Sequence, residues 1–69
     1  MKTRKTLVVK FQDSFARTLF LWDGAALGHR VRREADGLTL RVEVQRRTER
    51  REVRLRAYPY GAECRTEVR

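Results

Sequence analysis

Between Leu38 and Gln45 apolar and polar side chains alternate without interruption. Because successive side chains of a β-strand point to opposite faces, this period of two predicts a strand with one covered face and one polar face. A shift of one residue in its pairing would turn the whole apolar set toward solvent, so the pattern also restricts which partner strands fit. The apolar set is Leu38, Leu40, Val42 and Val44.

A second alternating run lies at residues 52–58, where Val53, Leu55 and Ala57 are separated by Arg54, Arg56 and Tyr58. With Thr48 and Glu49 as turn residues, strands 38–45 and 52–58 form a hairpin in which each apolar residue meets an apolar partner. Pro59 ends the pairing because proline has no amide hydrogen to donate. The sequence therefore predicts a C-terminal β-hairpin, or meander, rich in arginine.

Two further segments have strand character. Residues 6–12 place Leu7, Val9 and Phe11 on one face, and residues 62–68 alternate small or apolar side chains with charged ones. Charged side chains on the last segment discourage additional pairing, which is typical of an edge strand.

Residues 14–35 admit more than one interpretation. The segment 15–22 fits a short helix almost as well as 17–22 fits a buried strand, and Phe20 and Trp22 are expected in the core because of their large apolar area. Residues 24–35 fit either a helix, with Leu27 among its apolar positions, or a strand at 29–35 that is turned by Asp36 and Gly37.

These patterns predict an α+β fold: an antiparallel sheet with strands near 6–12, 38–45, 52–58 and 62–68, and one helix drawn from residues 14–35 over its apolar face. A small all-β barrel is the alternative. A chain of 69 residues is expected to form one domain, residues 1–69, with little interior for a deep catalytic pocket.

Catalytic chemistry has few candidate residues. His29 is the only histidine and Cys64 the only cysteine, which excludes an internal disulfide. Without a Cys-x-x-Cys pair or a Cys/His cluster, neither a metal nor another cofactor is expected, and the protein is expected not to be an enzyme. No apolar run is long enough for a membrane span and no signal-peptide core follows Met1, so we expect a cytoplasmic protein with no membrane partner.

Charge is the feature that points to a partner. Lys and Arg number 17 against 9 Asp and Glu, which gives a formal net charge of +8. In the predicted hairpin Arg41 opposes Arg56 with Tyr58 beside them, and like charges opposed on a sheet are destabilising unless an anion lies over them. Four arginines surround the predicted turn, two on either side of Thr48 and Glu49.

Our first hypothesis is therefore a nucleic-acid-binding module that contacts phosphates through the arginines of the hairpin and stacks bases on its tyrosines. The alternative is an inhibitor or modulator of the kind that phages and mobile elements encode, docking on an acidic protein surface of a nucleoprotein enzyme. A homodimer is compatible with both. The predicted binding residues are Arg41, Arg46, Arg47, Arg50, Arg51, Arg54, Arg56, Tyr58 and Tyr60.

Overall fold

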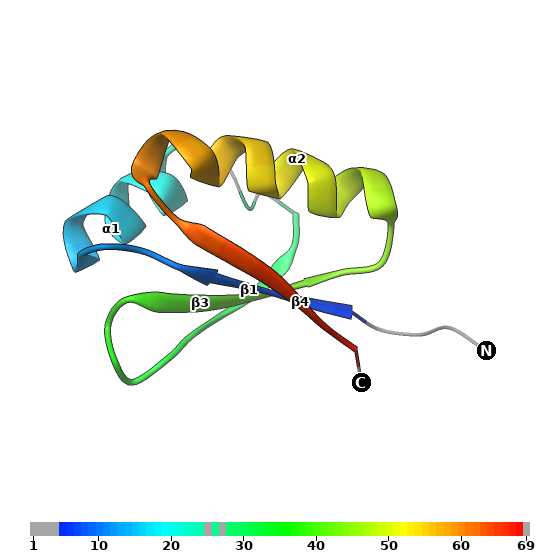
Figure 1. The fold of residues 1–69 in the computed structure, drawn as a ribbon, viewed down its shortest axis with the longest axis horizontal. Coiled ribbons are helices and arrows are strands. Elements are labelled where there is room, and N and C mark those ends of the chain that lie inside the picture. Colours follow the sequence, from blue (N-terminus) through cyan, green and yellow to red (C-terminus); the bar gives the residue numbers. More distant parts are fainter. Residues whose placement is uncertain (1–4, 25, 27, 69) are drawn as a thin grey trace.

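A four-stranded antiparallel sheet forms one layer of the molecule, and two helices that cover one of its faces form the other (Figure 1). The computed structural model describes residues 5–24, 26 and 28–68. In chain order the elements are β1 (Lys5–Lys10), α1 (Ser14–Trp22), β2 (Arg30–Arg33), β3 (Thr39–Val44), α2 (Arg47–Ala57), a 3-10 turn η1 (Tyr58–Tyr60) and β4 (Glu63–Val68). The α+β prediction is confirmed, and the sheet is open rather than closed into a barrel.

The strand order is β2-β3-β1-β4, and every neighbouring pair is antiparallel. β1 and β2 are both antiparallel to β3, so they are parallel to each other with β3 between them. The same holds for β3 and β4, which flank β1. This connectivity, βαββαβ, is the split βαβ or ferredoxin-like arrangement, a topology that hosts many functions and by itself indicates none.

The central strands β1 and β3 supply most of the core. Leu7 lies opposite Val42 and Val9 opposite Leu40, and all four side chains are buried beneath the helices. The alternation predicted for residues 38–45 is confirmed, since the inward side chains of β3 are the apolar ones. β4 pairs with β1 at the edge of the sheet, as predicted for residues 62–68.

Helix α1 begins where Asp13 accepts a hydrogen bond from the backbone amide of Ala16 at 2.7 Å, a side-chain N-cap. Phe20 faces the sheet and is buried, with its ring 5.2 Å from that of Phe11. Trp22 was expected in the core with Phe20, and this expectation is wrong: Trp22 is 83% exposed. Two residues along a helix are about 200° apart around its axis, so the two rings point in opposite directions.

The predicted strand at residues 52–58 and the arginine-rich β-hairpin are also wrong, because α2 occupies Arg47–Ala57. Val53 and Ala57, four residues apart, are buried on one helical face, whereas Leu55 is 67% exposed. In a strand Val53 and Leu55 would share a face. Arginine, glutamate, leucine and alanine are all good helix formers, and Glu52 pairs with Arg56 one turn later at 3.1 Å.

The segment between α1 and β3 follows the strand interpretation, with β2 at Arg30–Arg33. Asp36 turns the chain into β3: its Oδ1 accepts the amide hydrogens of Leu38 and Thr39, each at 2.9 Å. Gly37 in that turn has φ of +74°, a left-handed conformation that favours glycine. Leu27, which belonged to the alternative helix, lies outside the described residues.

Candidate nucleic-acid interface

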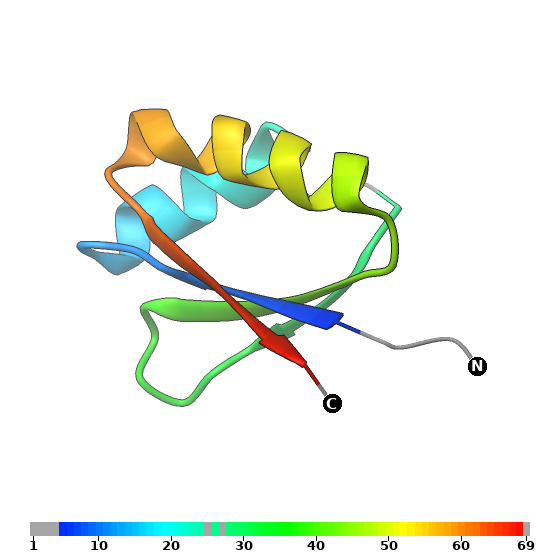
Figure 2. The same cartoon turned by 45° about the vertical axis from the view of Figure 1, so that its right-hand side comes forward.

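The nine predicted binding residues separate onto two faces of the molecule. Arg41 lies on β3, in the sheet, whereas the other eight lie on α2, at its N-cap or in η1. Figure 2 shows both helices on one face of the sheet. Arg41 lies between Leu40 and Val42, which are buried beneath the helices, so its side chain points to the opposite face. The predicted opposition of Arg41 and Arg56 is therefore absent, because it required residues 52–58 to pair with β3.

Arg41 belongs to the uncovered surface of the sheet, which we call the outer sheet face. Cross-strand partners in register define it. Arg32, Arg41, Val8 and Arg65 form one row across all four strands, and rows of mixed charge lie on either side. The complete set is Thr6, Val8, Lys10, Arg30, Arg32, Glu34, Thr39, Arg41, Glu43, Glu63, Arg65 and Glu67.

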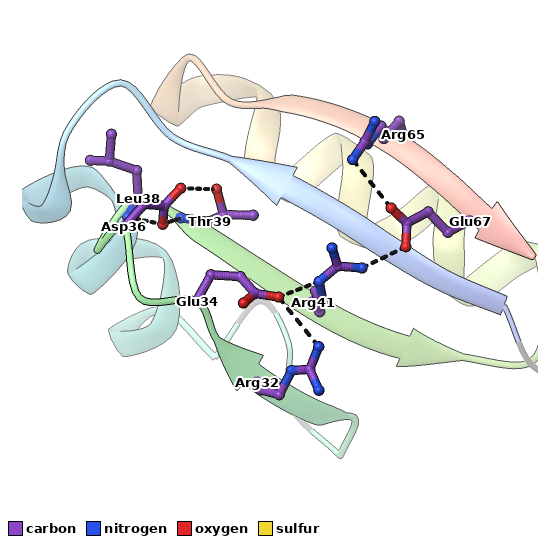
Figure 3. Close-up of polar contacts among 8 residues, drawn as sticks. All are labelled: Arg32, Glu34, Asp36, Leu38, Thr39, Arg41, Arg65 and Glu67. Carbon is purple, nitrogen blue, oxygen red and sulfur yellow. Dashed lines mark hydrogen bonds and ion pairs between the residues drawn. The ribbon is translucent and has the colours of Figure 1, made fainter. Parts of the chain in front are cut away.

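On the outer sheet face three of the four arginines pair with carboxylates. Arg41 donates through Nε to Glu34 and through Nη1 to Glu67, so one guanidinium bridges carboxylates from two sides (Figure 3). Arg65 pairs with Glu67 at 3.2 Å. The hydrogen bond from Arg41 lowers the pKa of Glu34, and hydrogen bonds to Glu67 and Glu34 raise the pKa of Arg41.

The composition of the outer sheet face also bears on stacking. Its twelve side chains include five cations and four carboxylates, which leaves little excess charge, and no aromatic ring. Sheets that bind single-stranded nucleic acid use aromatic side chains as stacking platforms. The outer sheet face therefore has the character of a self-compensated surface.

Helix α2 has a row of arginines that are not paired with carboxylates of the described residues. Arg47, Arg50, Arg51 and Arg54 have the spacing i, i+3, i+4 and i+7, which places them within about 100° of arc around the helix. We call these four residues the arginine stripe. They line a shallow surface groove together with Thr48. From Arg47 to Arg54 the stripe extends about 10 Å along the helix axis.

The two glutamates of α2, Glu49 and Glu52, form ion pairs with residues outside the stripe. Glu49 Oε2 lies 3.5 Å from Nδ1 of His29, and Glu49 Oε1 lies 3.7 Å from Nε of Arg46. Glu52 pairs with Arg56. Within residues 5–24, 26 and 28–68, no carboxylate lies within ion-pair distance of an arginine of the stripe.

Two arginines of the stripe are held by neutral acceptors. Arg54 donates to the hydroxyl of Thr66 on β4 at 2.7 Å, and Arg50 donates to the carbonyl of Gln45 at 3.3 Å. Such contacts restrict a guanidinium without cancelling its charge. The stripe is thus a set of partly ordered, uncompensated cations along the side of α2 that faces β4.

The two predicted tyrosines differ in their surroundings. Tyr58 follows Arg54 by four residues and is 81% exposed, so its ring continues the line of the stripe. Tyr60 is half-buried, and its ring packs edge-on against Phe20 at 6.0 Å. Tyr58 is therefore free to stack on a base, whereas Tyr60 contributes to the core.

The structure places one acid beside the single histidine, which sequence reasoning did not find: His29 and Glu49 come from different segments, twenty residues apart. In the described part of the chain, no three His, Cys, Asp or Glu side chains come together as metal ligands would. Cys64 is half-buried against the core, and burial raises the pKa of its thiol, which keeps it protonated and weakly nucleophilic at neutral pH.

Comparisons with protein-family models, with curated protein sequences and with solved structures find no match to this chain. Neither α1 nor α2 has the length or apolar character of a helix that crosses a membrane, a finding that covers the described residues.

Proposed function

We propose that this protein binds nucleic acid through the arginine stripe of α2, mainly by contacts to phosphates. The observation that carries the proposal is the pairing of charges within α2. From Arg46 to Ala57 there are six arginines and two glutamates, a net charge of 6 − 2 = +4, which is half of the +8 of the chain. Because both glutamates pair with residues outside the stripe, its four cations keep their charge for a partner.

The form of the stripe favours nucleic acid over an acidic protein surface. Its four arginines lie along one side of a helix, and a nucleic acid offers a linear, regularly spaced array of phosphates. Guanidinium binds phosphate with two parallel hydrogen bonds, and Tyr58 adds a ring at the end of the line. Contacts of this kind fix position without reading bases, so we expect little sequence preference.

The test is a titration of labelled duplex and single-stranded DNA and RNA at several salt concentrations. Four phosphate contacts predict a slope of log affinity against log salt near −3.6 on duplex DNA, or roughly a hundredfold weakening between 50 and 200 mM salt. Replacing two arginines of the stripe, Arg47→Gln with Arg51→Gln, is expected to reduce the slope by about 2.

A matched control removes the same total charge from the outer sheet face, through Arg32→Gln with Arg65→Gln. Both of these arginines are more than half exposed and both pair with a glutamate. We expect this variant to bind nearly as tightly as the original protein. Equal losses in the two double variants would assign binding to overall charge, and absence of binding at low salt would reject the proposal. In that case, capture of one protein that survives nuclease treatment would favour an acidic protein partner.

A further inference from the structure

The outward face of α1 is apolar and has no partner among the described residues. Phe15 is 70% exposed and Trp22 is 83% exposed, Thr18 is also exposed, and Leu19 is partly exposed. These four residues are spaced i, i+3, i+4 and i+7, which places them on one side of the helix. Monomeric proteins rarely expose two large aromatic rings on one side of a helix of nine residues. Exposed apolar patches of this kind commonly mark interaction sites.

The charges around this face differ from those of the rest of the molecule. Arg17 is the only basic residue of α1, and its Nε is buried without a hydrogen-bond partner. Asp13 and Asp23 flank the two ends of the helix. For two copies of a chain with a net charge of +8, the outward face of α1 therefore adds no exposed arginine of its own to the contact. The arginine beside it is Arg56 of α2, which lines a surface hollow together with Asp23.

We infer that α1 is a dimerisation surface and that its partner is a second copy of this chain. The face is self-complementary about a two-fold axis that passes between Thr18 and Leu19. In an antiparallel pair, residue i lies opposite residue 37 − i of the partner, so Phe15 meets Trp22 and Thr18 meets Leu19. A two-fold interface requires this reciprocity.

The same register is compatible with the flanking charges. It places Asp23 opposite the Ser14 hydroxyl of the second copy and Asp13 opposite Gly24, so no two carboxylates face each other. A one-turn shift would leave one aromatic ring of each copy without a partner. The positions of the two rings and the charges at the helix ends therefore favour this one register of the two α1 helices.

The size of the face sets the strength of the dimer. Aromatic side chains bury about 150–250 Å² each, so the two rings with Leu19 and Thr18 bury on the order of 400 Å² per copy, or about 800 Å² in total. Specific interfaces begin near 1,200 Å², so an interface of this size corresponds to a weak or transient dimer that forms at high protein concentration. It would present two arginine stripes, one from each copy.

Sedimentation equilibrium over a range of concentrations tests the inference, together with fluorescence of Trp22, the single tryptophan. As mass increases from monomer to dimer, we expect the emission to shift to shorter wavelength and to become protected from a soluble quencher. Raising the salt concentration is expected to favour the dimer by screening the like net charges, which is the opposite of its effect on nucleic-acid binding.

Two variants identify the face. Thr18→Arg puts two cations beside the two-fold axis, and Phe15→Ala removes one ring while keeping the tryptophan signal; we expect each to weaken the dimer at least tenfold. Leu55→Ala is the matched control, because Leu55 is equally exposed but lies on α2. Circular dichroism verifies that each variant is folded. A chain that remains monomeric at millimolar concentration, or a dimer that tolerates both variants, would overturn the inference.

Discussion

The outer sheet face and helix α2 are both rich in arginine, yet they use it differently. On the sheet, Arg41 bridges Glu34 and Glu67, and neighbouring arginines share the same carboxylates. On α2, the glutamates pair with Arg46, Arg56 and His29, and the stripe is left with neutral contacts. Arginine content alone therefore does not distinguish the two surfaces, because the positions of the acidic residues decide which arginines have an ion-pair partner.

Helix α2 packs on the sheet through one face, which contains Val53 and Ala57. Val53→Asp would bury a carboxylate without a partner, because Val53 is 1% exposed, and we expect a loss of about 3 to 5 kcal/mol in the free energy of unfolding. Leu55→Asp changes an exposed position and is expected to cost only about 0.5–1 kcal/mol. Urea denaturation measures both. Similar losses in the two variants would indicate the strand arrangement, in which both residues share a face.

Two carboxylates near the outer sheet face, Glu34 and Asp36, make the stability of the fold depend on pH. Hydrogen bonds depress the pKa values of Glu34 and Asp36 below their ordinary 4.5 and 3.8, through Arg41 and through the Thr39 hydroxyl respectively. A depressed carboxyl pKa stabilises the fold above the ordinary value, and this stabilisation is lost as the pH falls through the pKa of the folded state. Thermal stability should therefore decrease as the pH is lowered below about 4.5.

Arg41→Met isolates the contribution of Arg41. At neutral pH it leaves two carboxylates without their shared cation, so we expect the melting temperature to fall on the order of a few degrees. Because Glu34 then lacks the main cause of its low pKa, the further loss in acid should be smaller than in the original protein. Arg51→Met, in the stripe, is the control and should leave the melting temperature nearly unchanged. Indistinguishable acid profiles for the original protein and Arg41→Met would contradict the assigned network.

The smallest effect is expected at the start of α2. Arg46 is the N-cap of this helix and makes no side-chain capping bond, whereas Asp13 caps α1. Arg46→Ser would create a Ser-x-x-Glu capping box with Glu49, which should stabilise the protein by about 0.5–1 kcal/mol. Since Arg46 lies outside the stripe, nucleic-acid affinity should fall less than in Arg47→Gln. Calorimetry and the binding titration compare the two variants, and a larger loss for Arg46→Ser would place the interface elsewhere.

The sequence predicted the sheet better than the helices, for physical reasons. Long alternating runs such as residues 38–45 have one periodic interpretation, so β3 and its buried face followed directly. In residues 52–58 the positions of Val53 and Ala57 satisfy both a period of two and a helical turn. In the structure, the exposure of Leu55 distinguishes the helix from the strand, and exposure depends on tertiary packing. The high helix propensity of arginine and glutamate in this segment was the available signal.

The sequence predicted which residues belong to the candidate site but not how they are arranged in space. The arginines of the stripe and Tyr58 were all among the predicted residues, because the cluster is visible in the chain. Because residues 47–57 form a helix and not a strand paired with β3, Arg41 lies apart from the arginine stripe. The 3-10 turn after the helix directs Tyr60 toward Phe20. The pairing of Glu49 with His29 joins segments that no local spacing connects.

The pairing of β1 with β4 has a consequence for how the protein is made. Lys5 lies opposite Val68, so the inner strand β1 obtains its second neighbour from a segment far away in the sequence. Contacts between residues so distant in sequence form late, because a long loop must first close. During synthesis, α2 would emerge from the ribosome before the strand that holds Arg54 through Thr66. The arginine stripe would therefore reach its final order only after β4 has formed and paired with β1.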